Sequence, residues 1–165
     1  MGPQKDGSLE KEVFMTQTSG YDVEMTRILS APPDRVYQAF VDPSQFVRWY
    51  GPEGFPVDPG SIELDAHVGG RQRFDMVSEA DPSMRTGFNG RFTEVAENAL
   101  LESTGAWDGI PGQSEPWPSG LRIEFHDDAG KTRLVLREGP HPPGTADLGR
   151  QAWEVMLPKL ESLVS

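Results

Sequence analysis

The regular alternation of apolar and polar residues begins just after residue 20 and predicts a strand as the first element. Val23, Met25 and Leu29 alternate with acidic and hydroxyl side chains, which is the period of two that a half-buried strand shows. Arg27 falls on the apolar side of the same strand. Because an inward arginine is either paired or directed into a cavity, we expect Arg27 to serve as a structural ion-pair partner or as a polar anchor inside the fold.

Two short helices are expected next. Pro32 and Pro33 end the strand, and the apolar residues after them recur at helical spacing as far as Val41. Asp42 is then a favourable N-cap, and the proline that follows it suits the first turn of a second helix. We expect this second helix to stop at Gly51.

Short alternating runs separated by turn residues fill the middle of the chain. The expected strands cover residues 57–64, 71–76, 88–92, 100–107, 121–125 and 132–136. Residues 127–130 are typical of a tight hairpin turn, whereas residues 108–120, rich in proline and glycine, are expected to form a long loop. Strands that follow one another with short links form an antiparallel sheet, here of about six to seven strands.

The last predicted element is a helix over residues 146–164. Trp153, Leu157 and Leu160 fall on one face at helical spacing. Pro158 lies inside the helix and points away from that face, so the helix either bends at the proline or breaks into two. Together these elements predict the α+β class: a sheet, two short helices after its first strand, and a long C-terminal helix.

The first 20 residues show neither sustained periodicity nor a strand bounded by turns. We therefore expect a flexible N-terminal arm at residues 1–20 and one domain at residues 21–165. Met15 is an alternative start of the chain. A domain of this length is large enough to bury one sizeable core.

Charge and composition narrow the classes of partner. The formal net charge is −11, and no cluster of lysine and arginine offsets it locally. Binding to nucleic acid or to an anionic membrane surface is therefore disfavoured. No stretch approaches the roughly 20 apolar residues that a membrane span needs. The chain has no cysteine, which excludes disulfides and thiolate sites and suits the reducing cytoplasm.

No set of catalytic residues stands out. His67, His126 and His141 are far apart, lack metal-ligand spacing, and are expected on the surface or in loops. Four glutamates in the predicted strands have the parity of an outward, solvated face: Glu63, Glu94, Glu102 and Glu124. We therefore expect no catalytic residue, no metal and no cofactor, and favour a binding protein over an enzyme.

Four segments carry a resemblance to a known family. These are "ILSAPPDRVYQAFVDPSQFVRWYGPEGF" (residues 28–55), "VGGRQRFDM" (68–76), "GFNGRFTEV" (87–95) and "AWEVMLPKLESLV" (152–164). In order and spacing they resemble the activator of Hsp90 ATPase homologue 1-like family of the START-like (SRPBCC, Bet v 1-like) superfamily. The resemblance implies the helix-grip fold, in which a curved antiparallel sheet grips the C-terminal helix.

In many relatives the space between sheet and helix holds an apolar ligand. The resemblance and the aromatic pattern give these expected ligand-binding residues: Arg27, Trp49, Phe74, Met76, Phe88, Phe92, Trp107, Trp117 and Trp153. Trp107 and Trp117 flank the predicted long loop and are expected at the mouth of a cavity, although an aromatic residue in the core has the same sequence pattern.

The favoured function is therefore non-catalytic binding of a small hydrophobic molecule, as a carrier or sensor with a stress-related role as one option. An Hsp90 co-chaperone is one alternative, although residues 1–20 are too few to form the additional N-terminal domain of the eukaryotic activator. A polyketide aromatase/cyclase-like enzyme is the other alternative, and it would need Arg, His or Ser side chains inside a deep pocket. The pattern leaves open whether the protein is a monomer or a homodimer.

Overall fold

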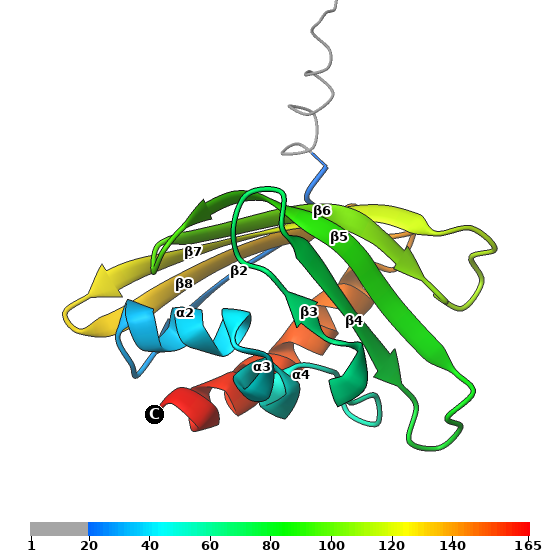
Figure 1. Cartoon of the computed structure of the whole chain (residues 1–165), viewed down its shortest axis with the longest axis horizontal. Helices are drawn as coiled ribbons and strands as arrows, with labels where there is room; N and C mark the ends of the chain where they lie inside the picture. The colour runs from blue at the N-terminus through cyan, green and yellow to red at the C-terminus, as the bar shows by residue number, and fades with distance from the viewer. Residues whose placement is uncertain (1–19) are drawn as a thin grey trace, which may run out of the picture.

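The computed structural model describes residues 20–165 (Figure 1). Apart from its last residue, the N-terminal arm expected at residues 1–20 lies outside the described residues, as does the alternative start at Met15. Both therefore stay predictions.

In the described part of the chain, seven strands form one antiparallel sheet. The strands are β2 (Val23–Leu29), β3 (Glu63–Leu64), β4 (Arg71–Val77), β5 (Arg85–Ala96), β6 (Leu100–Asp108), β7 (Trp117–Asp128) and β8 (Lys131–Gly139). Their order across the sheet is β2-β8-β7-β6-β5-β4-β3, so consecutive strands are neighbours except that β2 pairs with β8. The predicted antiparallel sheet is confirmed.

Three α-helices of residues 20–165 lie on the same side of the sheet, under its arch (Figure 1). They are α2 (Pro33–Val41), α3 (Pro43–Trp49) and α4 (Ala146–Val164). The side chain of Asp42 caps α3 by accepting a hydrogen bond from the backbone N–H of Ser44 at 3.0 Å. Helix α4 runs through Pro158, whose side chain is exposed, so the alternative of two separate helices is wrong.

Two sequence predictions differ from the structure. Instead of a strand over 57–64, Asp58 caps a short 3-10 turn, Pro59–Ser61, and only two residues of β3 follow it. The proline and glycine in this turn interrupt the extended backbone. The long loop predicted at 108–120 is shorter, because β7 already begins at Trp117, which pairs with Trp107 across β6 and β7.

Close contact between β5 and β6 helps to curve the sheet. Gly90 and Gly105 are directly opposite each other, and a Cβ atom on either residue would overlap the backbone of the other strand. The register also shifts between Phe92 and Glu94, which marks a bulge. Glycines and bulges at such positions let a sheet bend around the elements that it covers.

Aromatic side chains fill the half of the interior beneath α2 and α3. Phe40 and Trp49 have ring centroids 4.8 Å apart, and Phe46 stacks on Tyr50 at 4.7 Å and meets Phe74 at 5.1 Å. Each such pair adds about 0.5–1.5 kcal/mol beyond the burial of its surface. This end of the interior is therefore densely packed, with only a small space beside Phe40, Phe46 and Phe74.

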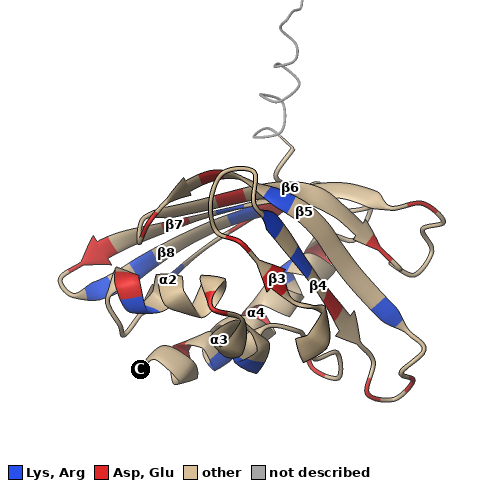
Figure 2. Cartoon of the chain, viewed as in Figure 1, with Lys and Arg blue, Asp and Glu red and all other residues tan. Residues whose placement is uncertain are grey.

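The outer face of the sheet carries charged residues of both signs (Figure 2). Arg122 is the centre of one network and lies 3.1 Å from Glu94, 3.3 Å from Glu102 and 3.2 Å from Glu124. These three glutamates therefore occupy the outward face that their parity predicted. Within residues 20–165 there is no helix long and apolar enough to cross a membrane.

Candidate ligand-binding pocket

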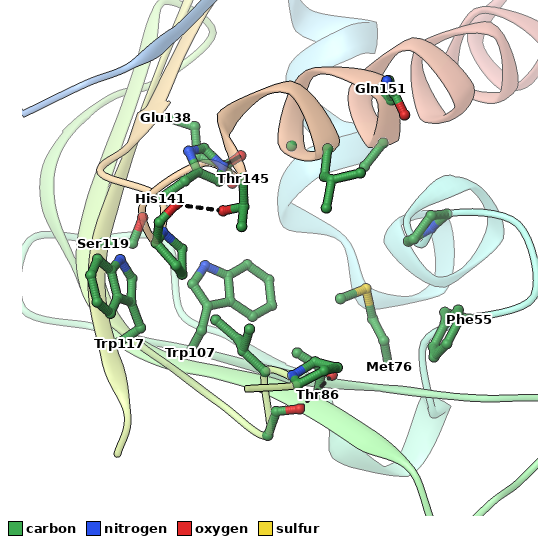
Figure 3. A pocket seen from close by; sticks show the side chains of 18 of the residues that line it. Phe55, Met76, Thr86, Trp107, Trp117, Ser119, Glu138, His141, Thr145 and Gln151 are labelled. Atoms are coloured by element: carbon green, nitrogen blue, oxygen red, sulfur yellow. Dashed lines mark hydrogen bonds and ion pairs between the residues drawn. The ribbon is translucent and has the colours of Figure 1, made fainter. Parts of the chain in front are cut away.

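A pocket of about 930 Å³ opens beside the N-terminal half of α4. Its other walls are the segment after α3, the ends of β4 to β7, and the link between β8 and α4. Figure 3 shows Trp107 projecting into the pocket between Trp117 and Met76. The main apolar side chains in the walls are Phe55, Met76, Trp107, Ile110, Trp117 and Trp153.

The hairpin of β6 and β7 places two of the tryptophans. Trp107 and Trp117 stand directly opposite each other in the ladder, so both lie on the inner face of the sheet. The ring of Trp107 packs against Phe74 and Phe88, at centroid distances of 5.7 and 5.2 Å. The indole N–H of Trp117 donates to the backbone carbonyl of Pro140 at 2.8 Å, which fixes that ring against the β8–α4 link.

One end of the pocket wall is a cluster of polar side chains. Nδ1 of His141 lies 2.7 Å from Oδ1 of Asp22, and its Nε2 lies 3.3 Å from Oε1 of Glu138. The indole N–H of Trp153 donates to the same Oε1 at 3.0 Å. Helix α4 and strand β8 therefore meet at the Glu138 carboxylate, and His141 links that carboxylate to Asp22, the residue before β2.

The ionisation of this cluster follows from its geometry. Burial alone would lower the pKa of His141, but hydrogen bonds and charges from Glu138 and Asp22 outweigh burial and raise the pKa to about 9. Burial would raise the pKa of Asp22, yet hydrogen bonds from His141 lower it below its ordinary value. His141 is thus a cation at neutral pH with a carboxylate on each ring nitrogen, and it is not available as a general base.

A smaller inner space of about 20 Å³ lies beneath the pocket. It shares Tyr50, Trp107, Ser119, Glu138 and Trp153 with the pocket above. Burial, followed by the charge of Glu138, raises the pKa of Tyr50 well above its ordinary value, so its hydroxyl is protonated. The inner space therefore combines apolar rings with neutral and charged polar groups.

The predicted ligand-binding residues divide into three groups. Met76, Trp107, Trp117 and Trp153 line the pocket. Phe74 and Phe88 reach the inner space but not the larger pocket. The remaining three lie elsewhere.

Trp49, Phe92 and Arg27 do not reach the pocket. Trp49 is 0% exposed, and its indole N–H donates to the carbonyl of Ala39 at 2.8 Å, which makes it a core residue. Phe92 is also buried in the core. The prediction that Arg27 points inward is wrong: its side chain is exposed and donates to the carbonyl of Thr26. Because β2 is an edge strand, a long side chain can turn around the edge to reach water.

Two residues of the polar cluster were missed. His141 lies in a loop, as one option of the prediction had it, but its side chain is only 16% exposed between its two carboxylates, and this role was not foreseen. Glu138 had a usable signal, because it continues the inward parity of Leu134 and Leu136 along β8. A glutamate on the apolar parity of a strand is a candidate for an interior role.

No group of three or more metal-ligating side chains forms a candidate metal site within the described residues. The pocket is instead apolar over most of its surface, with one charged corner. A curved antiparallel sheet wrapped around a C-terminal helix, with two short helices after the first strand, defines the helix-grip class of proteins.

The chain belongs to the family described as activator of Hsp90 ATPase homolog 1-like protein, whose model matches residues 30–165. Among solved structures, a protein from Chromobacterium violaceum is similar, with 28% identity, a TM-score of 0.75, and coverage of 86% of this chain and 96% of that one. The AHSA1 protein from Silicibacter pomeroyi has 21% identity, a TM-score of 0.69, and coverage of 85% and 94%.

A protein from Nitrosomonas europaea, with 20% identity, has a TM-score of 0.71 over 87% of this chain and 94% of that one. At 20 and 21% identity the last two likenesses concern the fold alone. No curated protein matches the chain.

Proposed function

We propose that this protein binds a small hydrophobic molecule in the pocket beside α4 and acts as a non-catalytic carrier or sensor in the cytoplasm. The observation that carries the proposal is the pocket itself. Its volume of about 930 Å³ lies within the range of roughly 300–1,000 Å³ that ligand pockets occupy. Four of its wall residues were expected from the sequence as ligand contacts.

The rim of the pocket supports an apolar ligand. Leu148 on α4 is 63% exposed, and Val155 and Met84 beside the same opening are also exposed. Three large apolar side chains around one opening form a surface that an apolar molecule meets before it enters. The cysteine-free composition supports a reducing compartment such as the cytoplasm.

The polar groups of the pocket support binding over catalysis. Both ring nitrogens of His141 face carboxylates, and Arg85 at the rim is paired with Asp58 and Asp75 at 2.9 and 2.8 Å. Neither side chain is free to activate a substrate or a water molecule. An aromatase/cyclase-like role is therefore the weaker alternative.

Native mass spectrometry of the purified protein, with organic extraction of the same sample, tests the proposal. We expect a native mass greater than that of the polypeptide, and we expect the organic solvent to extract the bound molecule. The Ala152→Phe variant, which places a ring in the pocket wall, should lose this excess mass, whereas Ala96→Phe on the exposed end of β5 should keep it. The carrier role would be refuted if the native mass equals that of the polypeptide alone and no compound in a screen of lipids and aromatic molecules binds the protein.

The family description also names an activator of the Hsp90 ATPase. The co-chaperone alternative makes a separate prediction, namely that the protein stimulates the ATPase of an Hsp90-type chaperone. That assay gives a readout independent of the pocket. Stimulation by Ala152→Phe at the level of the unmodified protein would assign the activity to another surface.

A further inference from the structure

The floor of the pocket carries acceptor atoms that no described residue satisfies. Gln72 and Glu138 both line the inner space and are 9% and 7% exposed. Oε1 of Gln72 has no hydrogen-bond partner but is sealed away from the space, so a ligand cannot reach it. Trp153 and His141 approach Oε1 of Glu138, which leaves its Oε2 without a partner among residues 20–165. Glu138 lines both the inner space and the larger pocket, and its Oε2 is not sealed away from solvent.

The charge at this floor is negative. Asp22, His141 and Glu138 together carry one net negative charge when both carboxyls are ionised and the imidazole is protonated. The other cation in the pocket lining is Arg85, whose charge is already matched by Asp58 and Asp75 at the rim. A ligand carboxylate placed at the floor would therefore face Glu138 without a free cation beside it.

The chemistry of the floor matches a particular donor. A primary ammonium group has three N–H donors, and Ser119 and Glu138 supply oxygen atoms around the same inner space. Tyr50, Trp107 and Trp153 line that space as well, and aromatic faces attract cations. The space of about 20 Å³ exceeds the roughly 10–15 Å³ that a water molecule needs, and an ammonium head is similar in size to a water molecule.

We propose that the ligand is an apolar molecule that ends in a protonated primary amine. Its ammonium group lies at the floor against Glu138 and Ser119, and its apolar body extends past Trp107 toward the rim at Leu148. This inference rests on the proposed function, because it specifies the class of molecule that the same pocket binds.

Calorimetric titration with a series of equal chain length tests the inference. The probes are dodecylamine, dodecanol, dodecanoate and dodecyltrimethylammonium, the last of which is a cation without N–H donors. At neutral pH we expect dodecylamine to bind with one-to-one stoichiometry and about tenfold or more tighter than each of the others, because a charge-assisted hydrogen bond is the strongest contact available at the floor.

Two variants locate the amine. Glu138→Gln should weaken dodecylamine binding by about tenfold and leave dodecanol binding within about threefold. Ser119→Ala, which removes a hydroxyl acceptor from the same space, should weaken dodecylamine in the same direction and keeps the test valid if Glu138→Gln does not fold. Glu154→Gln, an exposed change on α4 away from the pocket, should have no effect.

The outcomes separate the two proposals. If dodecanol or dodecanoate binds as tightly as dodecylamine, the amine inference is overturned while the apolar pocket stands. If both cations bind equally and Glu154→Gln weakens them as much as Glu138→Gln does, the attraction is that of an acidic surface and the inference fails. If none of the four probes binds, the proposed function fails together with the inference.

Discussion

His141 shows how the ionisation of one residue is tied to the stability of the fold. Its pKa is about 9 in the folded protein against an ordinary value of 6.5, so the folded state holds the proton more tightly than the unfolded chain. The resulting stabilisation is fully present below pH 6.5 and is lost as the pH rises through about 9. We expect the free energy of unfolding to fall by about 1–2 kcal/mol across this window, a value reduced for partial solvent access.

Urea denaturation at a series of pH values measures this change. The His141→Gln variant cannot gain a proton, so its free energy of unfolding should lack the decline between pH 6.5 and about 9. His126, which lies 2.8 Å from Glu124 on the outer face, provides a matched control, since His126→Gln should keep the decline. Equal pH profiles for the unmodified protein and His141→Gln would show that this histidine is not the group responsible.

At the scale of a single element, helix α4 contains a glycine where helix propensity favours alanine. Gly149 lies in the first turns of the helix, and a Cβ atom there would overlap Nε2 of His141. The close approach of the histidine ring to the helix backbone therefore requires a residue without a side chain.

We expect Gly149→Ala to destabilise the protein by about 1–2 kcal/mol, although alanine is favoured by about 1 kcal/mol in a helix. The displaced ring should also titrate closer to pH 6.5, which NMR of the histidine side chains can follow. Ser162→Ala, an exposed change later in α4, should be neutral or slightly stabilising. A gain in stability for Gly149→Ala would mean that the link before α4 adapts without cost.

The elements of this fold differ in how far the sequence predicts them. The bounds of α4 followed from its apolar spacing, because a helix packed on one face repeats that face regularly. The prediction of a strand over 57–64 was wrong. The apolar residues on either side of the capped proline–glycine turn alternate as they would in a strand, although the turn interrupts the backbone. Trp117 was assigned to a loop because the prolines around it conceal a strand whose pairing with β6 is visible only in three dimensions.

The pocket was predictable in part. The aromatic pattern identified Trp107 and Trp153, yet the same pattern selected Trp49 and Phe92, which pack in the core. Sequence parity gives the face of an element and not the distance to the opposite wall. His141 could not be found this way, because it lies in a loop without periodicity and one of its two carboxylate partners, Asp22, is 119 positions away.

For the whole molecule, the interior is packed beneath α2 and α3 and open beside the start of α4. A ligand that fills the open part binds the folded state alone, so it stabilises the protein by mass action. At a free concentration one hundred times its dissociation constant, this amounts to about 2.7 kcal/mol.

We expect such a ligand to raise the melting temperature by about 5–10 °C in a domain of this size. Differential scanning calorimetry with dodecylamine measures the shift, and Ala152→Phe provides the comparison. A shift of the same size in both proteins would place the bound molecule outside the pocket.

The pairing of β2 with β8 also has a consequence for synthesis of the chain. Val23 pairs with Glu138, and Asp22 binds His141, so both contacts join residues more than one hundred positions apart. A nascent chain therefore holds β2 without its neighbour until nearly the whole domain has left the ribosome. Contacts of such long separation slow folding because a large loop must close first. The charged corner of the pocket is assembled at this closure, so the binding site is complete only when the two ends of the domain have met.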